Sequence, residues 1–178
     1  GRTIGLVGAV TPTLGQITNT GDITITPMIV GSTVDVPALA GAIQPAVDAL
    51  TSRGVDQVIL LAHMQRIAIE RELATLLNGV DIIVAGGSNR RLLDATDRLY
   101  PGDAAQGEYP GVYTSPAGEP VLVVNTDGDY KYLGRLVTRF TLGGTIDVDA
   151  LDPEVNGAYA TDAESWEAFG APAPNDDV

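Results

Sequence analysis

The chain has 178 residues, 44% of them hydrophobic, with 23 acidic and 10 basic side chains and a net charge of −13. A chain of this length buries roughly 70% of its unfolded surface, which excludes a disordered protein and a disulfide-stapled miniprotein. The absence of cysteine excludes a thiol nucleophile, an iron–sulfur cluster and cysteine-held zinc. The acidic excess and an aromatic content of 5% argue against binding to polymeric nucleic acid.

The first predicted element is a strand. Residues 3–10 form a nearly continuous apolar run, which is typical of a strand covered on both faces. Residues 13–36 are rich in Gly, Thr, Asn and Pro and predict a loop with one short edge strand. Between residues 37 and 53, apolar side chains recur at steps of three and four, which predicts a helix whose exact start depends on how Pro45 is accommodated.

The next stretch predicts a βαβ unit. Residues 58–62 and 80–84 are short apolar runs, and the apolar side chains of residues 67–77 share one helical face. The runs are far shorter than the roughly 20 residues of a membrane helix, so we expect no membrane insertion. A βαβ unit implies parallel neighbouring strands, whose functional residues collect just beyond the carboxyl ends. His63 and residues 86–89 follow those ends, so we expect chemistry there.

The second half predicts a different pattern. Residues 94–119 form a long loop rich in Asp, Gly, Pro and Tyr, and loops of that length are usually functional. Residues 120–124 predict another strand. Residues 130–140 and 146–148 predict a C-terminal antiparallel hairpin, so the fold class is α/β with a mixed sheet.

The end of the chain is acidic. Beyond Arg139 the sequence holds nine acidic side chains and no basic one. We therefore predict a folded unit over residues 1–150 and an acidic connector or tail over residues 151–178, with a short helix at 163–169.

His63 is the only histidine, which excludes a histidine pair and a His-only metal site. Its place directly after an apolar strand suits a metal ligand or a general acid. It equally suits a hydrogen-bonded histidine that ends a strand.

A glycine turn follows the strand at 80–84 and reads Ala85-Gly86-Gly87-Ser88-Asn89-Arg90-Arg91. Backbone N–H groups in such a turn can hold an anion, and Arg90 or Arg91 can bind a phosphate with two hydrogen bonds. The turn lacks the lysine of a Walker loop and the spacing of GxGxxG, so an ordinary surface turn is the alternative. Residues 125–129 lack the glycine and glutamate of an EF-hand loop and predict a turn between strands.

Four stretches, in this order, carry a resemblance to a known family: Gly5–Pro12, Leu60–Gln65, Gly79–Asn89 and Asp127–Leu136. Together they resemble the bacterial 5′-nucleotidase and alkaline-phosphatase-like branch of the calcineurin-like metallophosphoesterases, over residues 3–142. The resemblance implies part of a metallophosphoesterase-type β-sandwich flanked by helices. It also implies a hydrolase whose two metal ions act on a phosphate ester such as a nucleotide.

The resemblance also implies site residues. The family's histidine after the apolar strand is a metal ligand and corresponds to His63. The family's later motif, Gly-His-x-His, corresponds to Gly86-Gly87-Ser88-Asn89, where both histidines are replaced and Asn89 offers an amide oxygen as the second ligand. The residues expected to bind substrate are Gly86, Gly87, Ser88 and Arg90, and no catalytic residue is assigned.

The family's first metal motifs, Asp-x-His, Gly-Asp and Gly-Asn-His-Asp/Glu, have no counterpart in this sequence. We therefore expect the C-terminal half of a metallophosphoesterase domain, inactive alone, whose partners are the missing N-terminal half and a following C-terminal domain. The resemblance implies divalent ions (Mn, Ca, Mg or Zn) in the longer protein and a periplasmic or extracellular location.

Two other interpretations stay open. The chain can be a non-catalytic binding or structural domain that has lost the binuclear site. A self-contained flavodoxin-like binding module would need a complete parallel sheet, of which two or three strands are predicted.

Overall fold

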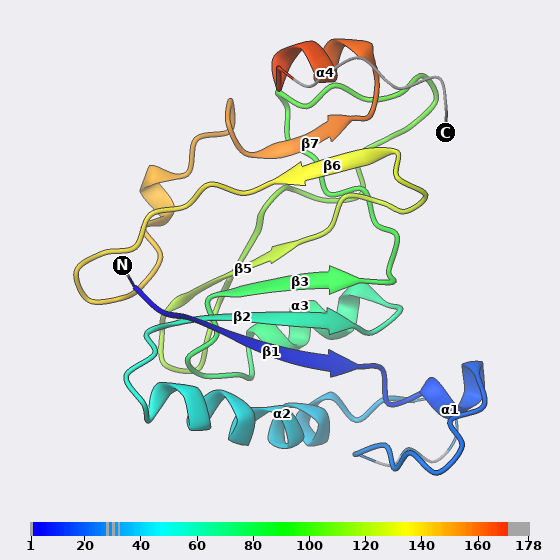
Figure 1. Ribbon diagram of the computed structural model, residues 1–178, viewed down its shortest axis with the longest axis vertical. Helices are drawn as coiled ribbons and strands as arrows, with labels where there is room; N and C mark the ends of the chain where they lie inside the picture. The colour runs from blue at the N-terminus through cyan, green and yellow to red at the C-terminus, as the bar shows by residue number, and fades with distance from the viewer. Residues whose placement is uncertain (1, 28, 30, 32, 171–178) are drawn as a thin grey trace.

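The computed structural model describes residues 2–27, 29, 31 and 33–170. Its main element is a five-stranded sheet with the strand order β1-β2-β3-β5-β4. The strands are β1 (Ile4–Val10), β2 (Gln57–His63), β3 (Ile82–Gly86), β4 (Gly111–Thr114) and β5 (Pro120–Val124). All neighbours are parallel except β4, which runs antiparallel to β5 at the edge. The carboxyl ends of the parallel strands therefore lie on one side of the molecule, at the right of Figure 1.

Two helices cover one face of this sheet. α2 (Val36–Thr51) connects β1 to β2, and α3 (Ile67–Ala74) connects β2 to β3. Right-handed crossovers between successive neighbours place both helices on the same side (Figure 1). Asp35 caps α2 through its side chain. Pro45 lies inside the helix on its exposed side, so the carbonyl four residues earlier, which lacks the N–H donor that proline cannot supply, faces solvent.

The main core lies between the helices and the sheet. Its fully buried side chains come from α2 (Val47), β2 (Val58 and Leu60), α3 (Leu73) and β3 (Ile83). These side chains belong to the apolar stretches whose periodicity predicted the strands and helices. The predicted βαβ unit is therefore confirmed.

The opposite face of the sheet is largely uncovered within the described residues, and we call it the open face. It carries Ile4, Leu6, Val10, Leu61 and Val84, which are 57%, 62%, 45%, 47% and 40% exposed. The prediction that the first strand is covered on both faces is therefore wrong for this chain. A continuous apolar run shows that both faces suit burial, but the described residues cover only one of them.

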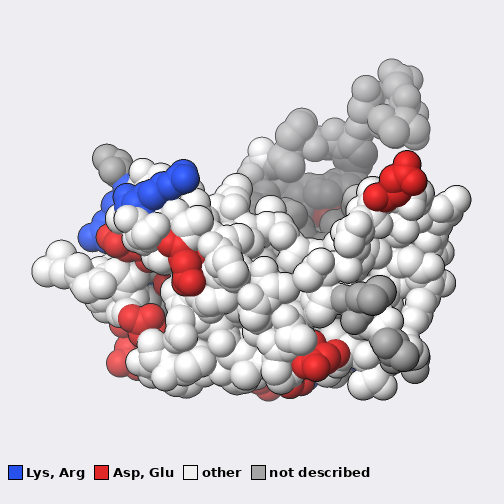
Figure 2. All heavy atoms as spheres, turned by 90° about the horizontal axis from the view of Figure 1, so that it is seen from below, with Lys and Arg blue, Asp and Glu red and all other residues white. Residues whose placement is uncertain are grey.

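Charge is also distributed unevenly. Figure 2, seen from below Figure 1 on the side of α2, shows mostly uncharged surface with few charged side chains. α2 contributes a single charged residue, Asp48. The acidic excess is concentrated instead beyond Arg139, in the C-terminal part of the chain.

A second, two-stranded sheet lies beyond β5 (Figure 1). β6 (Tyr132–Arg135) pairs antiparallel with β7 (Gly157–Ala160), and a small core of its own includes Tyr132 and Ala158. The antiparallel pairing predicted for the C-terminal part is confirmed, but the partner strand was wrong. The predicted hairpin of 130–140 with 146–148 is reduced to one bridge between Phe140 and Ile146, because alternation along a strand does not specify which segment pairs with it.

The stretch predicted as an acidic connector is partly structured. It contributes β7 and α4 (Ala163–Ala168), which agrees with the helix predicted at 163–169 and is capped by the side chain of Asp162. Residues 171–178 of the expected tail lie outside the described residues. The domain boundary at residue 150 stays a prediction.

Three further elements escaped the sequence patterns. The loop predicted at 13–36 contains the short helix α1 (Leu14–Ile17) and, in its described residues, no strand. The loop predicted at 94–119 contains β4, and a 3-10 turn follows at Val148–Ala150. None of the described helices combines the length and the apolar composition that crossing a bilayer requires.

One carboxyl group is buried where β2 leads into α3. Glu70, in the first turn of α3, is completely buried, and its Oε1 accepts a hydrogen bond from the backbone N–H of Met64 at 3.1 Å. Its Oε2 has no hydrogen-bond partner in the part of the chain that the structure describes. Burial raises the pKa of Glu70 to about 7, against the lowering effect of backbone hydrogen bonds.

The two faces of β2 predict losses of different size on truncation. Leu60→Ala removes a fully buried side chain and should lower the free energy of unfolding by about 2–5 kcal/mol. Leu61→Ala, on the open face, should cost less than about 1 kcal/mol in this chain. Chemical denaturation of the two variants measures the difference. Equal losses would show that the face we describe as open is covered in solution.

The buried carboxyl of Glu70 predicts a pH dependence. Because its folded pKa of about 7 exceeds the ordinary value of 4.5, the folded state binds this proton more tightly. The free energy of unfolding should therefore fall as the pH rises from about 4.5 to 7, by at most about 3 kcal/mol from this group. Glu70→Gln should remove that part of the slope.

Asp81 contributes in the same direction, because burial raises its pKa to about 6. The difference between the wild type and Glu70→Gln, followed by denaturation from about pH 4 to 8, therefore isolates Glu70. Parallel stability curves for the two proteins would contradict the assignment.

Candidate functional site

The carboxyl ends of β2 and β3 bring His63 and the glycine turn together. His63 is the last residue of β2 and pairs in register with Gly86, the last residue of β3. Alternation along β2 places the exposed His63 side chain on the same face as Leu61. The candidate site therefore lies where the open face meets the carboxyl edge of the sheet.

The imidazole of His63 lies against the backbone of this turn. A Cβ placed on Gly87 would lie 2.6 Å from His63 Cδ2, and one on Gly86 would lie 3.2 Å from Nδ1. Gly87 also has a φ of +75°, which favours glycine. In this arrangement a side chain at position 87 would occupy the space of the His63 ring, which gives glycine there a physical reason.

The turn presents unused donors next to this histidine. The backbone hydrogen bonds of the described residues do not include the N–H groups of Ser88 and Asn89, and Ser88 Oγ, shielded from solvent, has no partner among them. Asn89 has a φ of +49°, and its amide group lies against Gly128, where a Cβ would be 2.9 Å from Asn89 Cγ. Arg90 is exposed and has no ion pair within the described ranges.

Asn125 directly follows β5, and its side chain connects the end of β5 to the glycine turn that follows β3. Its Oδ1 accepts hydrogen bonds from the N–H groups of Arg90 at 2.9 Å and Asp127 at 3.1 Å, and its Nδ2 donates to the carbonyl of Ala85. Sequence patterns predicted only a turn at 125–129 and gave Asn125 no role. An Asn after a strand signals local side-chain bonding to the backbone, but not bonding to a turn 35 residues away.

The second arginine of the turn is already paired. Arg91 Nη1 lies 2.9 Å from Asp127 Oδ2. Both residues belong to a small charged cluster that also contains Asp103 and Lys131. In that cluster, hydrogen bonds from the side chains of Lys131 and Tyr132 hold the pKa of Asp103 below its usual range. Arg90 is therefore the arginine of this turn that remains available to a ligand.

A groove of about 480 Å³ opens beside the turn, on the open face of the sheet. Its apolar floor includes Val84 and Val124, and Leu136 forms part of its wall. Its polar end is formed by the glycine turn and Asp127. The groove thus joins an apolar surface to the edge where His63 lies.

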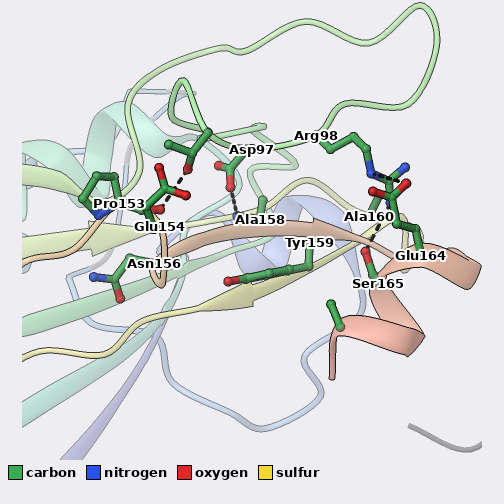
Figure 3. A pocket seen from close by; sticks show the side chains of 12 residues that line it. Asp97, Arg98, Pro153, Glu154, Asn156, Ala158, Tyr159, Ala160, Glu164 and Ser165 are labelled. Atoms are coloured by element: carbon green, nitrogen blue, oxygen red, sulfur yellow. Dashed lines mark hydrogen bonds and ion pairs between the residues drawn. The ribbon is translucent and has the colours of Figure 1, made fainter. Parts of the chain in front are cut away.

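A separate hollow of about 350 Å³ lies between the loop at Asp97 and Arg98 and the elements β7 and α4 (Figure 3). Its polar groups are largely partnered: Asp97 Oδ1 accepts from the N–H of Ala158 at 3.0 Å, and Arg98 Nε lies 3.3 Å from Glu164 Oε2. Neither His63 nor the glycine turn lines it, so it is not the candidate site.

Few metal ligands converge in this chain. Within residues 2–27, 29, 31 and 33–170, no three His, Cys, Asp or Glu side chains are grouped to hold a metal ion. The donors at the edge of the sheet are the imidazole of His63 and the amide oxygen of Asn89.

No family model matches the sequence. The chain is 34% identical to the 5′-nucleotidase of Bos taurus over 105 residues and 38% identical to a probable 5′-nucleotidase of Treponema pallidum over 108 residues. Each match covers 59% of this chain but only 18% and 17% of the relatives. The chain is therefore similar to one segment of these proteins.

Solved structures of nucleotidases are also similar to this chain. A 5′-nucleotidase precursor from Thermus thermophilus superposes with a TM-score of 0.68 and 28% identity, over 90% of this chain and 28% of that protein. A NAD nucleotidase from Haemophilus influenzae has the same fold, with a TM-score of 0.67 and 23% identity, over 92% of this chain and 31% of that one. Sequence similarity and fold together show that this chain is similar to one segment of the 5′-nucleotidases, about a fifth of the length of the relatives it matches in sequence.

Proposed function

We propose that this chain forms one side of the active site of a longer, metal-dependent phosphoesterase of the 5′-nucleotidase type. The observation that carries the proposal is that His63 and the turn Gly86–Asn89 meet at the carboxyl edge of the sheet, on its open face. Similarity to 5′-nucleotidases supplies the substrate class, a nucleotide phosphate ester.

His63 and Asn89 are the proposed metal ligands. One imidazole and one amide oxygen fit part of a divalent site, and the amide oxygen favours a hard ion such as Mn²⁺, Mg²⁺ or Ca²⁺ over zinc. Bound ions would supply Lewis acidity and lower the pKa of a bound water. This chain's own contribution is to hold the imidazole against the glycine turn.

The turn itself suits the phosphate of the substrate. Ser88 and Asn89 present backbone N–H groups that make no backbone hydrogen bond within the described residues, and Arg90 adds an exposed guanidinium. The Ser88 hydroxyl has no partner there and is shielded from solvent, so it joins them only if its side chain rotates toward the ligand. Gly86 and Gly87 allow a ligand to approach the backbone closely, because they carry no side chains. Together these groups can donate hydrogen bonds to a phosphate anion, which an acidic chain with a charge of −13 otherwise repels.

The open face is the proposed contact with the rest of the longer protein. Parallel sheets are usually covered on both faces, and five large apolar side chains of the parallel strands of this sheet are 40–62% exposed. We propose that an N-terminal segment covers them and brings the remaining metal ligands to His63. We further propose that a C-terminal domain follows and that the protein is exported, as the resemblance implies.

The second candidate is a non-catalytic domain of the same family. It is favoured by the small number of ligands, since the described residues hold no group of three metal-binding side chains. A nucleotide could then bind at the turn without being hydrolysed. The two candidates differ in whether reconstitution with an upstream segment produces hydrolysis.

Reconstitution tests the proposal. The chain alone should not hydrolyse AMP with added Mn²⁺, whereas co-expression with the protein segment encoded upstream should give activity that His63→Ala abolishes. Leu61→Asp should block reconstitution by placing a charge on the open face, while Leu142→Asp, at a fully exposed position in a turn, should not. A reconstituted complex that binds AMP without hydrolysing it would favour the non-catalytic candidate.

A glycine pair tests the contact at His63. Gly87→Ala and Gly118→Ala both place alanine at a positive φ, +75° and +83°, and should each destabilise the fold by about 1 kcal/mol. Only Gly87→Ala would also collide with the His63 ring, because nothing lies within 4 Å of a Cβ on Gly118. Calorimetric titration of the reconstituted protein should show at least about tenfold weaker Mn²⁺ binding in Gly87→Ala alone. Equal affinity in both variants would contradict a role for His63 in binding the metal.

A further inference from the structure

Asn125 holds three backbone groups with one side chain. It accepts from the N–H of Arg90 and of Asp127 and donates to the carbonyl of Ala85. Ala85 precedes the turn Gly86–Asn89 and Arg90 follows it. The side chain therefore clamps both ends of that turn.

Few other bonds hold the interior of the turn. Gly87 and Asn89 both have positive φ values, +75° and +49°, and the N–H groups of Ser88 and Asn89 are absent from the backbone hydrogen bonds of the described residues. A neighbouring backbone hydrogen bond, 2.9 Å long, joins the N–H of Asp127 to the carbonyl of Arg90. Both of these residues also donate their N–H groups to the Asn125 side chain. The conformation of the turn thus depends on its ends.

The same side chain fixes the exit of β5. By accepting from the N–H of Asp127, Asn125 sets the path of the chain into Gly128, which lies against the side chain of Asn89. A Cβ at position 128 would come within 2.9 Å of Asn89 Oδ1. One amide thus links the two contacts of the turn, that of Gly87 with His63 and that of Asn89 with Gly128.

We propose that Asn125 is a positioning residue that holds Gly87 against the imidazole of His63 and Asn89 against Gly128. The reason for this placement rests on the function proposed above, in which His63 and Asn89 are the metal ligands. The placement itself can be measured without metal or substrate. In this proposal Asn125 acts through the turn, by its hydrogen bonds to Ala85, Arg90 and Asp127.

The test compares Asn125 with a matched amide elsewhere. Gln44, in α2, also bonds backbone groups of a distant turn: its Oε1 accepts from the N–H of Asn78 at 2.9 Å and its Nε2 donates to the carbonyl of Asn78 at 3.0 Å. This turn precedes β3, at the opposite end of the strand from the site. Gln44→Ala therefore controls for the general loss of a stabilising side-chain amide.

The readout is the contact between the His63 ring and Gly87 in the 178-residue chain, followed by nuclear Overhauser effects from the ring protons to the Gly87 α protons. The wild type and Gln44→Ala should both show the cross-peak, and Asn125→Ala should lose it. Asn125→Asp keeps the oxygen acceptor but loses the donor to Ala85, so its cross-peak should weaken. It also serves as the test if Asn125→Ala does not fold.

A purely stabilising role predicts a different pattern. If Asn125→Ala or Asn125→Asp melts earlier but keeps the cross-peak and the wild-type shifts of Gly87 and Asn89, the positioning role is wrong. Failure of the proposed function looks different again. In that case Mn²⁺ would leave the His63 resonances of the reconstituted protein unbroadened, while the cross-peaks still followed the pattern above.

Discussion

The parallel register between β2 and β3 determines where the candidate site lies. Leu60 and Ile83 pair in this register and are both buried under the helices. Because side chains alternate along a strand, their burial forces Leu61 and His63 to the other face. A shift of one residue would bury His63 under the helices, so the main core fixes the exposure of the histidine.

The same constraint makes the site and the open face continuous. His63 follows Leu61 on that face, and the groove beside Val84 ends at the glycine turn. The five half-exposed apolar side chains of the open face could contribute on the order of 5 kcal/mol to an association that buries them. Any segment that gains this energy by covering all five side chains must also lie next to His63, so under the proposed function association and completion of the metal site are coupled.

Much of the fold could be predicted from the sequence because its central part uses regular periodicities. The strands at 58–62 and 80–84 and the helix between them have the predicted type, and parallel exits predicted that His63 and Gly86 would meet. Pairings between segments that are distant in sequence could not be predicted. β6 pairs with β7 rather than with residues 146–148, and nothing local distinguishes these partners.

The polar contacts at the site were the hardest to predict. An acidic residue in the first turn of a helix is usually exposed, yet Glu70 is buried and bonds to the turn after His63. Asn125 occupies a common turn position, and its bonds to Ala85 and Arg90 become visible only when β3 and β5 lie side by side. Side chains of this kind act on backbone brought near by the fold, so sequence spacing does not reveal them.

The central claim is that His63 and Asn89 complete a metal site only when another segment covers the open face. Anomalous diffraction from crystals of the longer protein grown with Mn²⁺ tests it most directly. The account predicts a manganese peak within bonding distance of His63 Nε2 or Nδ1 and of the Asn89 amide oxygen, with Leu6 and Leu61 buried by an upstream segment. A manganese site remote from both residues, or an open face still exposed to solvent, would contradict it.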